Sequence, residues 1–344
     1  MYLPLVLSLL LLPLTRSSLT LTVMTYNMGN NLCQLPESLS SHLPASDVVF
    51  VTTQETEPLK PRRTEGHRSV SLRRSVIRMC AGFRPVAIHS IGGIQSIVMV
   101  REGVAVEAVR VADVSVGVGG VVNNKGAIRV KVTPKGRGGN KGGKGKTMSI
   151  HLIGSHLAAH SENVSSRNEN YGTIWGTFSP DVDEGIGDVV VWAGDLNYRI
   201  EHENFDYVAG VVKGYYKGEG IADYDRDLKS ASLGTSRYAE LAKLDQLNKV
   251  RFLRSRGAPS EYAPWENFNE GEINFPPTYK LSKVPSRGSL RSGRDYDKKK
   301  GRVPSYTDRV LWRGKGVKCE FYDRVSNGCA SDHDPVVAVF KIDC

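Results

Sequence analysis

The sequence has few cysteines and lacks the motifs of cysteine-based and nucleotide-hydrolysing enzymes. Its five cysteines are odd in number, widely spaced and without a C-x-x-C pair: Cys33, Cys80, Cys319, Cys329 and Cys344. This pattern disfavours a structural zinc site or a disulfide framework. The chain has no C-x5-R phosphate loop, which argues against a cysteine phosphatase. It also has no G-x4-G-K-[ST] motif, which excludes a P-loop nucleotide hydrolase.

Long apolar runs are lacking except at the N-terminus. The run from Leu3 to Leu14 is long enough for the apolar core of a signal peptide but short for a membrane-spanning helix. No Lys or Arg precedes it, and no A-x-A cleavage site follows it. Residues 1–18 are therefore either a cleaved signal or anchor, or a mis-assigned start or buried extension. We expect residues 19–344 to form a single domain.

Acidic residues are in deficit. Lys and Arg number 46 against 36 Asp and Glu, which gives a net charge of +10 over 344 residues. Such a balance suggests an anionic partner, which could be nucleic acid, a membrane surface or a phosphorylated small molecule. The 40% of hydrophobic residues suffice for a sizeable core.

Strand-like runs dominate the chain, and a few helical stretches lie between them. Strands are predicted at Leu19–Tyr26, Asp47–Thr53, Gly93–Arg101, Val104–Val118, Ala127–Thr133, Met148–Gly154, Val189–Ala193, Arg309–Trp312 and Pro335–Lys341. Helices are predicted at Leu72–Gly82, Glu162–Phe178 and Ser236–Arg256. Because the order shows no regular βαβ rhythm, we expect a layered α/β domain with mixed sheets.

Two segments interrupt this pattern. Pro134–Lys146 is rich in Gly, Lys and Arg, and it is expected to form a solvated hairpin insert. Lys280–Arg302 carries nine basic residues separated by Ser and Gly. This stretch is either a solvated loop or a surface that contacts an anionic membrane.

Polar residues gather where the predicted strands begin or end. Asn27, Glu55, His156, Asp195 and Asn197 follow strands, whereas Asp308, Asp332 and His333 precede the last two strands. If those two strands run antiparallel to the others, all of these ends meet at one rim. The sequence thus predicts a single cleft that holds carboxylates, amides and two histidines.

These residue types suit a magnesium-dependent phosphate site. Magnesium prefers oxygen ligands and is usually held by one or two carboxylates, so Glu55 is the expected ligand, with Asn27 beside it. Histidines that stabilise a phosphoryl oxygen and an aspartate that activates water complete a hydrolytic set.

The order of these residues resembles the endonuclease/exonuclease/phosphatase superfamily. The similarity lies in Thr25-Tyr26-Asn27, Gln54-Glu55, Ser155-His156-Leu157-Ala158-Ala159, Trp192-Ala193-Gly194-Asp195-Leu196-Asn197-Tyr198-Arg199 and Ser331-Asp332-His333. Further motifs are similar to those of the inositol polyphosphate 5-phosphatases: Asn124-Lys125-Gly126, Arg167-Asn168, Phe275-Pro276-Pro277-Thr278-Tyr279-Lys280 and Pro304-Ser305-Tyr306-Thr307-Asp308-Arg309-Val310-Leu311. The resemblance runs in order from about Leu19 to Phe340.

The resemblance implies a DNase I-like fold, a four-layer α/β sandwich of two mixed β-sheets flanked by helices. It places Asn27 and Glu55 at Mg²⁺. It makes Asp195 the residue that positions or deprotonates the attacking water and lets Asn197 contact phosphate. His156 would stabilise the transition state, and His333 would contact the scissile phosphate. Asp308 would orient His333, and Asp332 would support the site.

The resemblance also implies how the substrate is bound. Tyr279, Lys280 and a lysine near Lys300 would bind the phosphate next to the scissile one, and Lys125, Arg167 and Asn168 would line the pocket. The implied reaction is magnesium-dependent removal of the 5-phosphate from phosphoinositide lipids, soluble inositol polyphosphates or both. We expect a monomer, peripheral contact with anionic membrane, no nucleic-acid partner and a cytoplasmic location. A secretory location is the alternative if residues 1–18 act as a signal.

The chain departs from the family pattern at three places. Asn123 replaces the usual Gly before Asn124-Lys125-Gly126, Tyr306-Thr307 replaces the commoner Trp-Cys, and Asp334 replaces the usual Arg after Ser331-Asp332-His333. We expect the negative charge of Asp334 to lie beside the site and to alter phosphate affinity or substrate preference. Two other functions compete, a nuclease or sphingomyelinase of the same superfamily and an inactive phosphoinositide-binding module.

Overall fold

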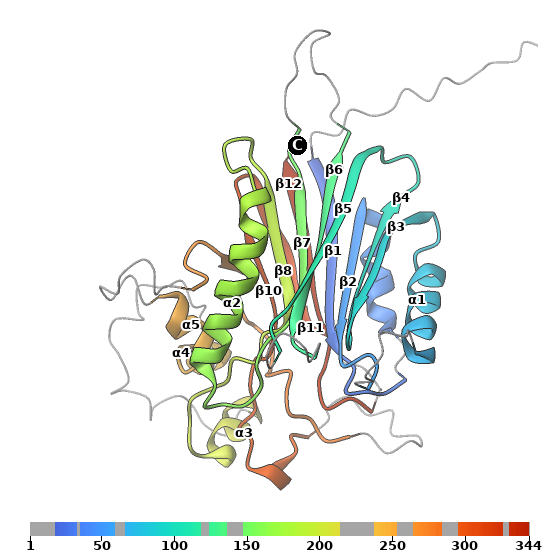
Figure 1. Cartoon of the computed structure of the whole chain (residues 1–344). Coiled ribbons are helices and arrows are strands. Elements are labelled where there is room, and N and C mark those ends of the chain that lie inside the picture. The colour runs from blue at the N-terminus through green and yellow to red at the C-terminus, as the bar shows by residue number, and fades with distance from the viewer. Residues whose placement is uncertain are drawn as a thin grey trace, which may run out of the picture.

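A computed structural model describes residues 18–32, 35–58, 66–117, 124–135, 147–213, 237–252, 264–283, 295–325 and 330–343. Two six-stranded sheets form the centre of the molecule, with helices outside them (Figure 1). The strands are β1 (Ser18–Asn27), β2 (Val48–Gln54), β3 (Phe83–Ile91), β4 (Ile94–Arg101), β5 (Val106–Ser115), β6 (Gly126–Pro134), β7 (Ile150–His156), β8 (Val189–Asp195), β9 (Asn269–Glu270), β10 (Asp308–Arg313), β11 (Val317–Arg324) and β12 (Val336–Asp343).

Each α-helix lies in a connection between two strands of the same sheet. The α-helices are α1 (His67–Met79), α2 (Val164–Phe178), α3 (Phe205–Lys213), α4 (Arg237–Lys243) and α5 (Gln246–Arg251). Short 3-10 helices are η1 (Glu37–Ser41), η2 (Leu43–Ala45), η4 (Ser179–Asp181) and η8 (Lys298–Lys300).

The two sheets share one topology. The first has the order β11-β12-β1-β2-β4-β3 and the second β5-β6-β7-β8-β10-β9. In each sheet the central pair is parallel, β1 with β2 and β7 with β8, and antiparallel strands flank it. The carboxyl ends of four central strands therefore point to one end of the molecule, where β10 and β12 begin. This arrangement confirms the mixed sheets predicted from the sequence.

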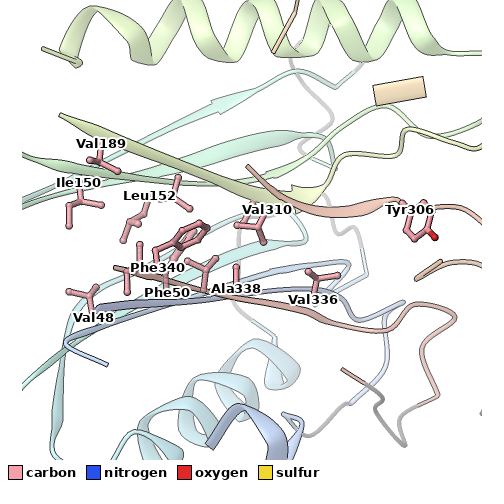
Figure 2. Packing of buried hydrophobic residues seen from close by; sticks show 14 of the residues in the cluster. Val48, Phe50, Ile150, Leu152, Val189, Tyr306, Val310, Val336, Ala338 and Phe340 are labelled. Carbon is pink, nitrogen blue, oxygen red and sulfur yellow. The ribbon is translucent and has the colours of Figure 1, made fainter. Parts of the chain in front are cut away.

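Side-chain alternation along the central strands builds three hydrophobic layers. In β2, Val48 and Phe50 point between the sheets, while Val49 and Val51 pack toward η1, η2 and α1. Figure 2 shows the inner layer, which includes Phe50 of β2 and Phe340 of β12. Both faces of β2 and β8 are covered, and the runs Val48–Val51 and Val189–Ala193 are accordingly continuously apolar.

Helices cover the two outer faces. Leu72 and Val76 of α1 pack on the first sheet, and Ile174 and Phe178 of α2 pack on the second (Figure 1). The second outer layer is rich in aromatic rings, with Trp192 at its centre. The observed layers are therefore helix, sheet, sheet and helix, which confirms the predicted four-layer sandwich.

Several predicted elements were wrong or missing. The sequence reading missed β3, β9, β11 and α3, and it began the first helix at Leu72 although α1 starts at His67. β3 and β11 are edge strands of the first sheet, and their sequences lack the regular apolar pattern from which the other strands were predicted. β3 contains Pro85 at a register shift, and β11 exposes Lys318. Proline and charged residues are common at sheet edges because one side of the strand is unpaired.

The predicted helix Ser236–Arg256 is interrupted within its described part. α4 ends at Lys243, and α5 begins after Asp245, whose carboxylate accepts a hydrogen bond from Asn248 N at 3.1 Å. Aspartate is a favoured N-cap residue, so it starts a new helix here. Apolar side chains of both helices are nevertheless buried, with Leu241 in the inner layer and Leu247 in the layer beneath α2.

Some predicted features fall outside the described residues. These are residues 1–17, most of the Pro134–Lys146 insert, and residues 284–294 of the basic stretch, which include Arg287, Arg291 and Arg294. Among the helices that the structure describes, none has the length and apolar character needed to cross a membrane.

Candidate active site

The predicted polar residues do meet at one rim. In the second sheet, Asp195 is aligned with His156 on β7 and with Asp308 on β10. In the first sheet, Asn27 is aligned with Gln54, and Glu55 follows directly. The antiparallel direction of β10 and β12 brings Asp308 and the residues before β12 to the same end, as the sequence predicted.

The two sheets approach closely near this rim. A Cβ atom added to Gly154 on β7 would lie 2.0 Å from Thr52 Oγ1 on β2, so only glycine fits there. Glu55 and Asn197 have positive φ angles of 48° and 58°. Such angles are uncommon for residues other than glycine and often mark functional sites. At both positions they occur where the chain turns away from a strand end.

A cavity of about 560 Å³ opens at the rim. Its volume suits a small, phosphorylated molecule. The predicted catalytic and metal-binding residues that line it are Asn27, Glu55, His156, Asp195, Asn197 and His333. Lys125, Tyr279 and Asp332 line it as well.

Asp195 is the centre of the hydrogen-bond network. Its Oδ2 accepts a hydrogen bond from Asn27 Nδ2 at 2.8 Å and lies 3.3 Å from His156 Nε2. Its Oδ1 accepts from the backbone N–H of Asn197 at 3.1 Å. Burial alone would raise the pKa of Asp195, but its contact with His156 and nearby positive charges hold the pKa well below its usual range. Asp195 is therefore a fixed anion at neutral pH.

His333 and Asp308 form a buried pair. Nδ1 of His333 lies 2.8 Å from Oδ2 of Asp308, and that oxygen also accepts hydrogen bonds from Thr278 and Thr307. Burial alone would lower the pKa of His333, but Asp308 and two further carboxylates raise it to about 10. The imidazole is therefore protonated at neutral pH, so both of its ring nitrogens carry a hydrogen. Asp308 is itself fully buried, which agrees with its predicted orienting role.

Lys125 and His156 form a second basic group beside Asp195. Lys125 Nζ lies 2.5 Å from His156 Nε2. Burial lowers the pKa of Lys125 to about 8. Burial and the charge of Lys125 lower the pKa of His156. At pH 7 the lysine carries the positive charge and the imidazole is neutral.

The donor set at Glu55 and Asn27 fits a hard cation. Glu55 Oε1 and Oε2 accept only long amide hydrogen bonds, at 3.4 Å from Asn27 and 3.3 Å from Asn30. No Lys or Arg of the described residues forms an ion pair with Glu55. Its carboxylate therefore keeps lone pairs that face the cavity, and carboxylate and amide oxygens are suitable magnesium ligands.

A second possible metal cluster has a different character. Asp195, Asp308 and His333 each offer a ligand atom within 4.8 Å of the others. Within this trio, His333 Nδ1 and Asp308 Oδ2 already contact each other at 2.8 Å. Glu55 has no charged partner of this kind among the described residues, so it is the better candidate for a metal ligand.

Four predicted substrate-binding residues do not line the cavity. Arg167 is fully buried and donates to the backbone carbonyls of Ala158, His160 and Ser161 and to the Gln246 side chain. Asn168 accepts a hydrogen bond from Tyr198 OH at 2.7 Å. Arg167 therefore binds the backbone of His160 and Ser161, which line the cavity, but neither Arg167 nor Asn168 lines it. This corrects the expectation that both residues line the pocket.

The two predicted lysines are also placed elsewhere. Lys280 forms an ion pair with Asp297, and its side chain is only 12% exposed. Lys300 is exposed, and Gly301, next to it, lines the cavity. In this structure neither lysine reaches into the cavity, so a direct role in binding phosphate would require each to move.

Two arginines that the sequence reading did not assign to the site do line the cavity. Arg302 donates a hydrogen bond to Tyr279 OH, and Arg199 donates one to Asn197 Oδ1. Arg199 also lies 4.4 Å from the centre of the Tyr279 ring. Arg199 ends the motif Trp192–Arg199, and Arg302 ends the basic stretch Lys280–Arg302. Nothing in one sequence distinguishes them from the arginines that form surface ion pairs.

Comparison with known proteins identifies the family of the chain. The family model of the endonuclease/exonuclease/phosphatase family 2 matches residues 24–339. Synaptojanin of Caenorhabditis elegans is 31% identical over 68% of the chain and 17% of its own length. The type II inositol 1,4,5-trisphosphate 5-phosphatase of Mus musculus is 29% identical over 92% of the chain and 29% of its own length. The chain thus spans less than a third of either curated relative.

A solved structure has the same fold. It is the inositol polyphosphate 5-phosphatase domain of SPsynaptojanin in complex with inositol (1,4)-bisphosphate and a calcium ion. Its TM-score is 0.69 at 24% identity, over 94% of this chain and 84% of that one. The chain therefore belongs to the endonuclease/exonuclease/phosphatase family 2 and, within it, to the inositol polyphosphate 5-phosphatases.

Proposed function

We propose that the protein removes the 5-phosphate of phosphoinositides or soluble inositol polyphosphates in a magnesium-dependent hydrolysis. The observation that carries this proposal is the cavity that joins a fixed anion, Asp195, to a protonated imidazole, His333, and to the Glu55 carboxylate, which accepts long amide hydrogen bonds. Relatives named as 5-phosphatases support the substrate class, and the related solved domain was crystallised with an inositol bisphosphate.

Glu55, with Asn27 beside it, would hold the metal ion. When bound, Mg²⁺ would supply a Lewis acid that polarises the phosphoryl group and neutralises its developing charge. The related domain's calcium ion supports a divalent metal in this fold family, and the oxygen-only ligand set favours magnesium.

Asp195 would orient the attacking water and accept its proton. Its carboxylate is held on both oxygens, by Asn27 and by the Asn197 backbone N–H, so its direction is fixed before substrate binds. A low pKa makes Asp195 a weak base in the resting state. Its first contribution is therefore orientation, and proton transfer follows as the water becomes acidic in the transition state.

His333 would donate a hydrogen bond from Nε2 to a phosphoryl oxygen. Asp308 binds the opposite nitrogen, which fixes the ring and stabilises its charge. Lys125 and Arg302 would add positive charge around the phosphates. Donors that are already aimed at the site of developing charge are effective because they need not reorganise during the reaction.

A second phosphate would bind at the side of the cavity formed by Tyr279 and Arg302. Arg302 already donates to Tyr279 OH, and its guanidinium can bind phosphate through two parallel hydrogen bonds. Lys280 could bind this phosphate only after its ion pair with Asp297 breaks. We therefore infer that Arg302, rather than Lys280, makes the primary contact with this phosphate.

Membrane contact and cellular location remain part of this proposal. Lys299 and Lys300 are exposed beside Gly301 and Arg302, at the mouth of the cavity. Basic side chains near an anionic membrane contribute roughly 1 kcal/mol each. These lysines support peripheral contact with an anionic membrane. A cytoplasmic location and a monomeric state belong to the proposal without support from these residues. The secretory alternative rests on residues 1–18.

A phosphate-release panel tests the proposed function. The protein is incubated with soluble inositol phosphates, short-chain phosphoinositides, DNA and sphingomyelin, with and without Mg²⁺. We expect phosphate release only from the 5-phosphorylated inositol compounds and only with the metal. Cleavage of DNA or sphingomyelin alone would assign the protein to another branch of the superfamily. Binding without turnover would identify a phosphoinositide-binding module.

A further inference from the structure

The His333–Asp308 pair is contacted by the short segment Pro277–Tyr279. Thr278 Oγ1 donates to Asp308 Oδ2 at 2.7 Å. The Tyr279 ring lies against the His333 ring, with 4.5 Å between their centroids. The position of this short segment therefore determines how both members of the pair are held.

Five described hydrogen bonds hold the backbone of this segment. Two of them pair Tyr279 with Ser305, at 3.2 Å and 2.7 Å. At the other end, Arg324 Nη1 donates to the Pro277 carbonyl at 3.1 Å, and Tyr296 OH donates to the same oxygen at 2.8 Å. Between them, the backbone N–H of Asp334 donates to the Thr278 carbonyl at 3.0 Å. Pro277 and Thr278 are therefore held by the end of β11, by the loop before η8 and by the residue after His333.

Asp334 does not face the cavity, contrary to what the sequence suggested. Its side chain is 2% exposed, and its Oδ2 lies 3.5 Å from Arg324 Nη1. It is not among the residues that line the cavity. The negative charge that replaces the usual arginine is therefore buried and neutralised by Arg324, away from the phosphate.

This ion pair links the catalytic segment to the edge of the first sheet. Removing one member of a buried ion pair is destabilising, so Arg324 and Asp334 help to hold each other in place. The same nitrogen of Arg324 contacts both Asp334 and the Pro277 carbonyl. Arg324 ends β11 and is aligned with Val336 of β12, so it stands on a rigid strand pair.

We propose that Arg324 and Asp334 are positioning residues that set the Thr278 hydroxyl against Asp308 and thereby orient His333. As a statement about catalysis the proposal rests on the proposed phosphatase function, although the alignment of the side chains is testable without it.

The first test is kinetic and uses the full chain. Arg324→Ala and Asp334→Asn should each lower kcat roughly 10- to 100-fold, the usual scale for partners that orient a catalytic group, with KM changed less than about twofold. Lys318→Ala is the matched control, because Lys318 lies on the same strand with its side chain 76% exposed. That variant should keep the parent kcat. If Arg324→Ala does not fold, Arg324→Lys and Asp334→Asn carry the test.

Combination with Thr278→Ala separates positioning from general stability. If the ion pair acts through the Thr278 hydroxyl, Arg324→Ala should lower kcat much less in the Thr278→Ala background than in the parent. Equal fold-losses in both backgrounds, or a lower melting temperature with unchanged kcat, would overturn the proposal.

A spectroscopic readout distinguishes this proposal from the proposed function. The Nδ1–H proton of His333 should give a downfield NMR signal because it is bonded to Asp308. We expect Arg324→Ala and Thr278→Ala to shift this signal and Lys318→Ala to leave it in place. An unshifted signal in Arg324→Ala would reject positioning even in an active enzyme. A shifted signal in a protein that hydrolyses no inositol phosphate would support positioning and reject the phosphatase function.

Discussion

Nδ1 of His333 lies 2.8 Å from Oδ2 of Asp308, and solvent barely reaches either side chain. Two threonine hydroxyls donate to the same carboxylate oxygen. A charged pair in such a buried place keeps its ionisation over a wide pH range, because each charge stabilises the other.

The first prediction concerns the protonation of His333. Its pKa of about 10 means that the imidazole stays protonated at pH 8, where an ordinary histidine is neutral. Asp308→Asn removes the main stabilising charge and should bring the pKa down by several units. An NMR titration of the imidazole checks both statements. A parent His333 that titrates near pH 6.5 would contradict the proposed charge state.

The second prediction concerns stability. A histidine whose pKa is raised on folding stabilises the protein fully below its unfolded pKa of about 6.5, and this contribution is lost as pH rises through about 10. His333→Gln should therefore cost more unfolding free energy at pH 6 than at pH 10. Urea unfolding of the parent and of His333→Gln at the two pH values measures this cost. Lys125 is present in both proteins, so its own pH dependence cancels when the unfolding free energy of the variant is subtracted from that of the parent. An equal cost at both values would mean that His333 is not charged by folding.

The third prediction concerns the residue that orients water. Asp195→Asn keeps the shape of the side chain but removes its charge and its capacity to take a proton. We expect kcat to fall at least about 100-fold, the usual scale for loss of a general base. Asp343→Asn, at an exposed site at the end of β12, is the control and should behave like the parent. A folded Asp195→Asn variant with a near-normal rate would assign the base elsewhere.

The fourth prediction concerns the second phosphate. Arg302 lines the cavity, whereas Lys280 is paired with Asp297. Arg302→Ala should raise KM about tenfold or more for a 4,5-bisphosphorylated substrate and much less for one without the 4-phosphate, because a charge-assisted bond is lost. Lys280→Ala should have a smaller effect on the same comparison. Should Lys280→Ala have the larger effect, substrate binding must open the Lys280–Asp297 pair.

The catalytic rim could be predicted from the sequence because its residues stand at strand ends. Asp195 ends the apolar strand β8, and His156 ends β7, the parallel strand beside it. Parallel neighbours end at the same edge of a sheet, so these two side chains meet whatever the sequence of the loops. Glu55 and Asn27 were found for the same reason. Once the direction of the strands is known, the positions of these residues along the chain are enough to predict that they meet at one rim.

The supporting contacts could not be predicted in this way. Arg167 is turned from the pocket by Gln246, which lies 79 residues further along the chain. Asp334 is neutralised by Arg324, and Lys280 by Asp297. Each pairing depends on two distant segments lying side by side, and one sequence carries no record of that proximity. The same limit explains why Arg302 was not assigned to the site.

The measurement that tests the central claim most directly is identification of the phosphate removed. The protein is incubated with inositol 1,4,5-trisphosphate, with Mg²⁺ or with excess EDTA, and the product is analysed by NMR. The account predicts inositol 1,4-bisphosphate as the single product with Mg²⁺ and no turnover with EDTA. Loss of the 1- or 4-phosphate, or undiminished release of the 5-phosphate in EDTA, would contradict it.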